Sequence, residues 1–301
     1  MHKKILIIAD LEGSSCCYNY EATTFLHPEW PDACLGLSLD INSVVKALFK
    51  AGVEKIYVKD FHRTAYNLVP ELIDKRAEII SGYHVGPVPG LGDPFDSTAV
   101  MMIGLHAPSG SEGFLPHTLT SRIARLEVNG RLMSEIQLFA ASLAPYNIKP
   151  IFFSGCPVAC QYASDEIKGL RCYSTQKHKK RTEYNPELWR EKLAKEAVSA
   201  LGQEGEIYRP AGKFKAVLTM RDGENYTRKI AERWKYEHND NQVFINAGSI
   251  HELYHCLIRL CYFTPLIEKI LPIGLALFNL RGRAGLLWVK TMIKKKTNAK
   301  Y

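Results

Sequence analysis

The first part of the chain alternates between continuous apolar runs and stretches with helical spacing. Apolar runs at 3–10 and 54–60 indicate two buried strands. Residues 37–52 lie between them, and their apolar positions recur with the period of a helix that ends at Gly52, a residue common just after a helix. This order of strand, helix and strand predicts two parallel strands joined by a right-handed crossover.

Two later apolar runs extend this predicted sheet. They cover residues 97–105 and 149–155, and each leads into a loop that contains glycine. Between them, alternating residues on either side of Asn129-Gly130 predict a hairpin, because this dipeptide favours the tight turn that joins two antiparallel strands. A helix is predicted over 135–144.

After about residue 170 the pattern changes to shorter and more polar elements. A polar stretch at 176–205 becomes helical, and a smaller α+β unit follows. Its expected elements are strands at 214–220 and 241–248 and helices at 223–235 and 249–263. We therefore predict an α/β fold with a mostly parallel sheet flanked by helices, then a smaller α+β domain and a basic C-terminal tail. The predicted boundaries are 1–170, 171–265 and 266–301.

Targeting and redox signals point to a reduced compartment. The apolar run that starts the chain stops at Asp10, which makes it too short for the core of a secretory signal. The longest apolar stretch, at 270–280, is shorter than the ~20 residues of a membrane-spanning helix. The eight cysteines include no Cys-x-x-Cys pair and indicate free thiols. A cytoplasmic location is expected.

The net charge of +8 is concentrated at the end of the chain. Seven basic residues and no acid lie within 281–301, so residues 1–280 are nearly neutral. The stretch 286–296 mixes Leu286, Leu287, Trp288 and Ile293 with four lysines, as helices that lie on a membrane surface do. A solvated basic tail after a packed helix is the first interpretation of this stretch, and attachment to a membrane surface is the alternative. No nucleic-acid-binding motif accompanies it, so nucleic acid is not an expected partner.

Polar residues gather where the predicted strands end. Asp10 and Glu12 follow the first strand, Asp60 and His62 close the second, and His106 follows the third. His117 lies in the loop after His106. In an open parallel sheet, ligands bind at the carboxyl ends of the strands. The pattern therefore places these side chains at one edge of the sheet.

Carboxylates and imidazoles at one edge favour divalent metal ions. Asp10 and Glu12 are two residues apart, so an extended backbone points both to the same side, where they can share one cation. Carboxylate and imidazole ligands suit zinc or manganese, and this many ligands could hold two ions. The alternative is that the acids cap the following helix or pair with lysines.

Four segments in order resemble the DppA-type zinc D-aminopeptidases. They are "ADLEGSS", "VKDFHRTAYNL", "IGLHAPSGSEGFLPHT" and "EVNGRLMSEIQLFAA", and the resemblance covers residues 4–160. It implies a hydrolase with two divalent ions, most simply zinc, and a ring-like homo-oligomer. It also implies that Asp10 bridges the ions, that Glu12 and His62 complete one site, and that His106 and Glu135 complete the other. His117 is implied as the catalytic residue.

The chain departs from the family pattern beside these residues. Phe61 and Arg63 replace a serine and a glycine, and Ser134, Gln137 and Phe139 stand where the family has glycine, glycine and asparagine. A Gly-Asp-Asp is replaced by Gly155-Cys156-Pro157. The implied ligands are all present, but several neighbours differ, so the usual substrate of the family does not follow.

Two other motifs allow different chemistry. Cys156 lies at a predicted strand end and could be a thiol nucleophile, although free cysteines are more often simply buried. His251, Glu252 and His255 match the His-Glu-x-x-His zinc motif, whose short length makes chance matches common.

These observations favour a metal-dependent aminopeptidase that hydrolyses short peptides, including D-amino-acid or modified ones. The alternatives are a metal-dependent amidohydrolase that acts on a non-peptide amide, and a membrane-surface binding protein built on a metallopeptidase scaffold.

Overall fold

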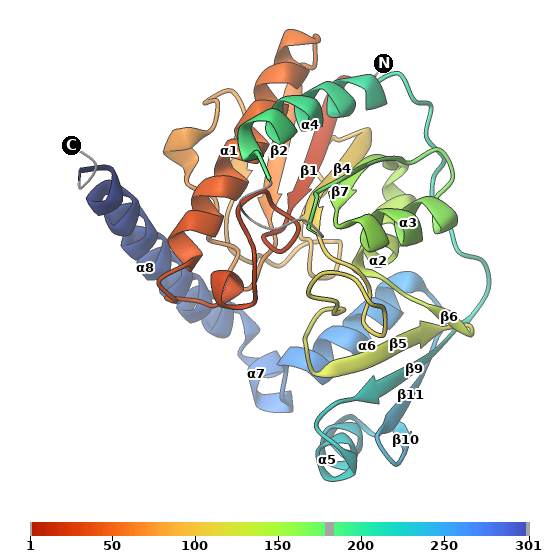
Figure 1. Cartoon of the computed structure of the whole chain (residues 1–301). Helices are drawn as coiled ribbons and strands as arrows, with labels where there is room; N and C mark the ends of the chain where they lie inside the picture. The colour runs from red at the N-terminus through yellow and green to blue at the C-terminus, as the bar shows by residue number, and fades with distance from the viewer. Residues whose placement is uncertain (1, 178–183, 299–301) are drawn as a thin grey trace.

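The structure is a computed structural model that describes residues 2–177 and 184–298 (Figure 1). Its larger sheet has six parallel strands in the order β3-β2-β1-β4-β7-β8. The strands are β1 (Lys4–Ala9), β2 (Lys55–Asp60), β3 (Glu78–Ile80), β4 (Ala99–Leu105), β7 (Lys149–Gly155) and β8 (Arg171–Ser174). The four strands predicted for this sheet are confirmed. The two short edge strands, β3 and β8, were not predicted.

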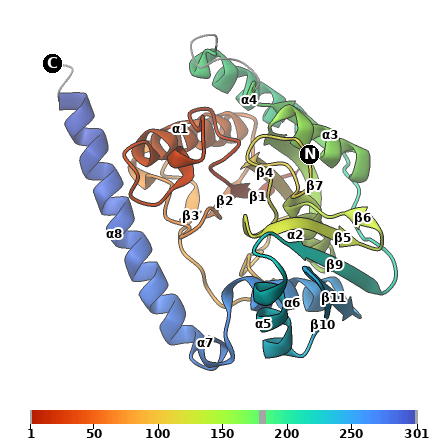
Figure 2. The ribbon, with the colours of Figure 1, turned by 60° about the horizontal axis from the view of Figure 1, so that its bottom comes forward.

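Helices cover both faces of this sheet, as predicted. Alternate residues of β1 point to opposite faces, so Ile5 and Ile7 pack with one hydrophobic core and Leu6 and Ile8 with the other. The first core includes α1 (Trp30–Lys50) and α4 (Pro186–Ala200), and the second includes α2 (Glu135–Leu143) and α3 (Pro157–Glu166). Figure 2 shows α1 and α4 on the opposite side of the sheet from α2.

Helix α1 begins at Trp30, seven residues before the predicted start. Pro31 lies in its first turn, where the missing N–H costs nothing. Gly36 interrupts the apolar period of the sequence. In the structure it packs so closely against Cys16 that a Cβ at position 36 would lie 2.4 Å from the Cβ of Cys16. The helix therefore continues through a position that sequence patterns treat as a break.

The smaller sheet is antiparallel, in the order β10-β11-β9-β5-β6. Its strands are β5 (Ile123–Val128), β6 (Arg131–Leu132), β9 (Phe214–Met220), β10 (Glu237–Asn239) and β11 (Gln242–Ala247), and α5 (Glu224–Trp234) and α6 (Ile250–Tyr262) flank it. The predicted turn joins β5 to β6, with positive φ at both Asn129 and Gly130. This sheet takes strands from both sides of residue 170, the expected domain boundary.

Among the described residues, three single-turn 3-10 helices lie in the connections. They are η1 (Glu21–Thr23), η2 (Pro70–Leu72) and η3 (Ala144–Tyr146).

The predicted tail is helical and packs on the body. It contains α7 (Pro265–Lys269) and α8 (Leu271–Asn298), and α8 lies along one outer side of the molecule next to α1 (Figure 2). The rings of Trp288 and Trp30 stack with centroids 6.0 Å apart, and Leu286 and Val289 are buried. Residues 299–301 of the predicted tail lie outside the described residues.

This packing corrects the predicted membrane-facing side of the tail. Leu286 is buried, and Trp288 and Ile293 pack against the core under α1, whereas Leu287 is exposed. The sequence pattern showed an amphipathic segment but could not show on which side the body lies. None of the helices in the described ranges is long and apolar enough to cross a membrane.

Candidate metal centre

The carboxyl ends of three neighbouring strands bring the predicted side chains together. Asp10 follows β1, His62 lies two residues after β2, and His106 follows β4. Glu12 belongs to the loop after β1, and Glu135 is the first residue of α2. All five residues are at least 95% buried. Three carboxylates in the interior are costly unless cations accompany them.

One half of the cluster consists of Asp10, Glu12 and His62. His62 Nδ1 lies 3.2 Å from Asp10 Oδ1 and 3.0 Å from Glu12 Oε2. The other ring nitrogen, Nε2, lies 3.0 Å from the backbone oxygen of Thr23. A carbonyl can only accept, so Nε2 carries the hydrogen and Nδ1 faces the two carboxylates.

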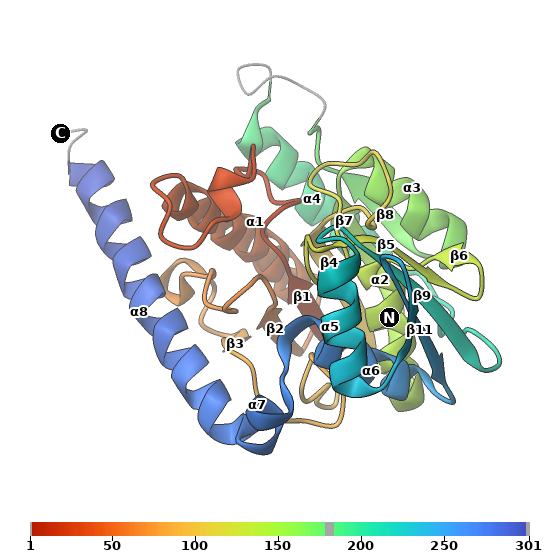
Figure 3. The same ribbon diagram turned by 90° about the horizontal axis from the view of Figure 1, so that it is seen from below.

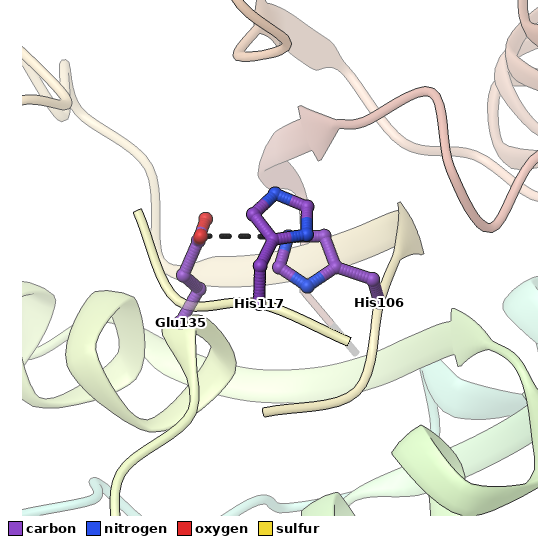
Figure 4. Close-up of side chains that lie close together, drawn as sticks. All are labelled: His106, His117 and Glu135. Atoms are coloured by element: carbon purple, nitrogen blue, oxygen red, sulfur yellow. Dashed lines mark ion pairs between the residues drawn. The ribbon is translucent and has the colours of Figure 1, made fainter. Parts of the chain in front are cut away.

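The other half contains His106, Glu135 and His117 (Figure 4). His106 Nε2 lies 3.4 Å from Glu135 Oε1 and 3.6 Å from Asp10 Oδ2, so Asp10 contacts both halves. His106 Nδ1 donates to the backbone oxygen of Ala107 at 3.1 Å. Glu135 Oε1 also accepts the backbone N–H of Leu119 at 2.6 Å, which fixes this carboxylate at the start of α2.

His117 lies over His106, at the more accessible side of the cluster. The two rings stack with centroids 3.6 Å apart and planes inclined by 14°. His117 Nδ1 donates to the backbone oxygen of Leu115 at 2.9 Å, and Nε2 lies 3.8 Å from Glu12 Oε1. Its side chain is 20% exposed, against 1% for His106. His117 is thus the member of the cluster that a bound molecule can reach.

The donor set fits divalent cations. Each of the three histidines donates one ring nitrogen to a backbone carbonyl and turns the other toward carboxylates, the arrangement that orients metal-binding histidines. Within the described part of the chain, His106 Nε2 is buried without a hydrogen-bond partner. Two groups, Asp10-Glu12-His62 and His106-His117-Glu135, each offer ligand atoms within 4.8 Å of one another.

The pKa shifts in the cluster reflect the negative charge of its three buried carboxylates. Burial disfavours charge on His62 and His106, but the facing carboxylates outweigh it and raise the pKa of each to about 10. Burial, together with the charge of Glu12, raises the pKa of Asp10 to about 7. Burial and the charge of His106 lower the pKa of His117 to about 4. The site therefore stabilises positive charge between its two halves and keeps His117 neutral.

Backbone anchors hold the loop that carries Glu12. Thr175 Oγ1 donates to the backbone oxygen of Gly13 at 2.6 Å, and Lys177 Nζ donates to that of Ser14 at 2.5 Å and to that of Cys17. Burial lowers the pKa of Lys177. These anchors lie after β8, and sequence reasoning missed them, because no spacing rule connects them to residue 12.

Asp60 positions His62 and does not itself face the cluster. Although it closes β2, its carboxylate accepts the backbone N–H groups of Asn67 and Leu68 and the side-chain amide of Asn67. Asn67 in turn donates to the backbone oxygen of His62 at 2.7 Å. The Asp60–Asn67 pair thereby fixes the turn that presents His62.

A cavity of about 200 Å³ borders the loops that carry Glu12 and His117. Tyr18 from the first loop and Phe114 from the second line it, and both rings lie close to Lys177 Nζ, at 5.6 and 4.9 Å. The cavity therefore combines aromatic walls with a partly buried cation.

Four of the departures from the family pattern contact one another in two pairs. Phe61 packs edge-on against Phe139, with ring centroids 4.6 Å apart. Ser134 caps α2, and its hydroxyl and backbone N–H both donate to the side chain of Gln137. The changes beside the ligands are thus mutually compatible and leave the cluster intact.

The two other candidate motifs, Cys156 and the His-Glu-x-x-His stretch, make their contacts outside the metal cluster. Cys156 Sγ accepts from the backbone N–H groups of Phe114 and Ala159 and so caps α3. His251 Nε2 lies 2.8 Å from the backbone oxygen of Ser142, and His255 lies 3.6 Å from Glu268.

Glu252 accepts the backbone N–H of Gly248 at 2.7 Å. The metal-binding groups found among the described residues do not include any of the three His-Glu-x-x-His positions.

Comparison with known proteins identifies the family. The family model described as D-aminopeptidase matches residues 3–257. The chain belongs to the D-aminopeptidase family. A D-aminopeptidase from Bacillus subtilis (strain 168) is 27% identical over 170 residues, which are 56% of this chain and 61% of that relative. All residues of the cluster lie within the part of the chain that the D-aminopeptidase model covers.

A solved structure shares the fold of this D-aminopeptidase family member. It is that of the Zn-dependent D-aminopeptidase DppA from Bacillus subtilis, described as a self-compartmentalizing protease. The similarity has a TM-score of 0.76 at 18% identity and covers 85% of this chain and 96% of the other. The predicted fold class and the family resemblance are both confirmed.

Proposed function

We propose that this chain is a metallo-aminopeptidase that releases the N-terminal residue of short peptides, with D-amino-acid peptides as the first class to test. The observation that carries the proposal is the cluster itself: three histidines, each held by a backbone carbonyl, face three buried carboxylates. Membership of the D-aminopeptidase family supports the reaction class.

We assign the ligands as two sets that share Asp10. Asp10, Glu12 and His62 would hold one divalent ion, and Asp10, His106 and Glu135 the other, with zinc as the expected metal. When bound, such ions supply Lewis-acid activation of a water molecule and of the scissile carbonyl. The tilt of His62 and His106 is set by their bonds to the backbone oxygens of Thr23 and Ala107.

His117 is assigned to proton transfer rather than to metal binding. Its Nδ1–H is held by the backbone oxygen of Leu115, so its free nitrogen is Nε2, directed into the cluster. Burial and the charge of His106 lower its pKa to about 4, so His117 is neutral and its Nε2 lone pair is available to assist proton transfer from the attacking water to the leaving amine. Its partial exposure supports a position beside the substrate.

The cavity next to these loops suits a single residue of the substrate. Its volume of about 200 Å³ and its aromatic walls fit one side chain, and we place the residue beside the scissile bond there. By analogy with the self-compartmentalizing neighbour, we also expect a homo-oligomer, which the mass of the purified protein in solution tests.

The deciding experiment is amino-acid release from matched D- and L-dipeptides and tripeptides, with and without chelator. Chelator-sensitive release is expected, strongest from D-peptides. If the protein hydrolysed only non-peptide amides, its function would be that of an amidohydrolase and not of an aminopeptidase. The absence of any hydrolysis by metal-loaded protein would contradict an enzymatic function.

Metal analysis of variants tests the assigned roles separately. Glu135→Ala and His62→Ala should each lower the metal content, whereas His117→Ala should keep it and lose at least about 100-fold in turnover. His238→Ala, on a strand of the smaller sheet, is the matched control. Metal loss in His117→Ala would make this residue a ligand instead.

A further inference from the structure

Exposed apolar side chains gather on α7 and α8. Of the fourteen large apolar side chains that are exposed among the described residues, eight lie between Leu266 and Leu287. Single exposed apolar residues are normal on protein surfaces, but a contiguous group marks an interaction site. The D-aminopeptidase family model ends at residue 257, so this group lies outside the part of the chain that the model describes.

The group forms one stripe along the outer face of α8. Ile273, Leu277, Leu280 and Leu287 are 61, 64, 63 and 65% exposed, and the exposed Ala284 fills the gap between the last two. Their spacings of four, three, four and three residues place them on one side of the helix. At 1.5 Å per residue the stripe is about 20 Å long.

The inner face of α8 is fixed to the body, so the helix cannot roll to bury the stripe. A Cβ on Gly282 would lie 2.2 Å from the ring of Tyr66, and one on Gly285 would lie 2.4 Å from that of Phe25. The side chain of Asn279 donates to the backbone oxygen of Tyr83 and accepts its backbone N–H, at 2.9 and 3.0 Å.

The charges that α8 itself carries are all positive, and two of its lysines, Lys290 and Lys296, pair with Glu71 and Asp32 of the body. Helix α8 contains no Asp or Glu between Leu271 and Asn298. The exposed Arg281 and Arg283 lie about 80° to either side of the stripe, at 100° per residue, and the exposed Lys294 and Lys295 follow its end. Pairing of two such helices face to face would bring arginines together, which disfavours a second copy of α8 as the partner.

We propose that the outer face of α8 rests on an anionic lipid surface. The helix lies parallel to that surface with the stripe below the headgroups, as amphipathic interfacial helices do. The exposed Lys294 and Lys295 beyond the stripe reach the lipid phosphates. The guanidinium group of Arg281, 4.7 Å over the Phe25 ring, and Arg283, whose Nε donates to the hydroxyl of Tyr66, keep the two flanks of the stripe positive. This face differs from the one predicted from sequence, and the proposal is independent of the peptidase activity.

Co-sedimentation with phosphatidylcholine vesicles, with and without phosphatidylglycerol, tests this proposal on the full chain. Binding to the anionic vesicles is expected, with little to the neutral ones. Leu277→Gln/Leu280→Gln should weaken binding on the order of 100-fold, because two exposed leucines lose their contact with lipid. Val85→Gln is the matched control, since Val85 is 73% exposed elsewhere.

A second variant separates charge from apolar contact. Lys294→Gln/Lys295→Gln should weaken binding only to the anionic vesicles, and added salt should have the same effect on the unchanged chain. Unchanged thermal unfolding of both variants shows that the fold is retained.

Two results would overturn the proposal. The first is equal sedimentation of the leucine variant and the unchanged chain. The second is a lower oligomer mass of the leucine variant in solution without any vesicle binding by the unchanged chain, which would make the stripe an interface between copies.

Discussion

Gly104 lies directly against the backbone of Asp10: a Cβ at Gly104 would be 2.2 Å from the Asp10 backbone oxygen. Gly104 has a φ of +82° and its N–H bonds to Ser154 Oγ. Strand β4 thus approaches the end of β1 as closely as a glycine permits. The position of the Asp10 carboxylate depends on this contact.

We predict that Gly104→Ala both destabilises the chain and lowers its zinc content. The added methyl group must push Asp10 away, which costs about 1–3 kcal/mol in addition to the left-handed backbone strain. Urea unfolding and metal analysis measure the two effects. The control is Gly130→Ala, because Gly130 has a φ of +78° with nothing within 4 Å of the added Cβ. Equal effects of the two substitutions would contradict the contact argument.

The same substitution should have opposite effects at two positions of α8. Gly282→Ala forces a Cβ to within 2.2 Å of the Tyr66 ring and should lower the free energy of unfolding by about 1–3 kcal/mol. Gly274→Ala meets no atom within 4 Å and should raise it by about 0.5–1 kcal/mol, because alanine favours the helix. Chemical denaturation compares them. A stabilising effect of Gly282→Ala would mean that α8 is not held against the body.

Because Lys59 is buried, we predict that the stability of the fold depends on pH. Burial lowers the pKa of Lys59 from 10.5 to about 8, and its ammonium donates to the backbone oxygen of Gly82. Between pH 8 and 10.5 the unfolded chain binds a proton at Lys59 that the folded chain lacks. The contribution of Lys59 to the free energy of unfolding therefore rises with pH in this window, by at most about 3 kcal/mol.

The substitution Lys59→Met isolates this contribution. The difference in unfolding free energy between Lys59→Met and the unchanged chain should shrink as the pH rises through this window, in chemical denaturation at several pH values. A difference that stays constant with pH would show that Lys59 is ionised normally in the folded chain.

Zinc should stabilise the folded chain, because only the folded state brings Asp10 and Glu135 together. At a free zinc concentration of 100 times the dissociation constant the gain is about 2.7 kcal/mol. Thermal unfolding with zinc and with chelator measures it. His106→Ala should lose most of the difference and His238→Ala none. A zinc-dependent gain that survives in His106→Ala would place the ion elsewhere.

Sequence reasoning found most of the cluster because the rule for parallel sheets is geometric. Asp10, His62 and His106 follow neighbouring strands, and their carboxyl ends meet at one edge whatever the detailed packing. Glu135 follows no strand of the large sheet. It starts α2 after a hairpin of the smaller sheet, so only the family resemblance pointed to it.

The side of α8 that faces the body could not be predicted from the sequence, and the physical reason is a different one. Its apolar residues occur on both sides, and only the glycines distinguish them, since Gly282 and Gly285 mark the side of closest approach to the body. A glycine in a sequence pattern suggests weakness rather than contact. The same ambiguity concealed the start of α1, where Gly36 packs against Cys16.

The stacking of Trp288 on Trp30 has an evolutionary consequence. Trp30 is 1% exposed, and α8, which lies beyond the D-aminopeptidase model, provides part of its cover. A relative without this helix would expose a large indole ring at the start of α1. The gain of the C-terminal helix and the residue at position 30 are therefore expected to have changed together, so that relatives which end near residue 257 carry a smaller or more polar side chain there.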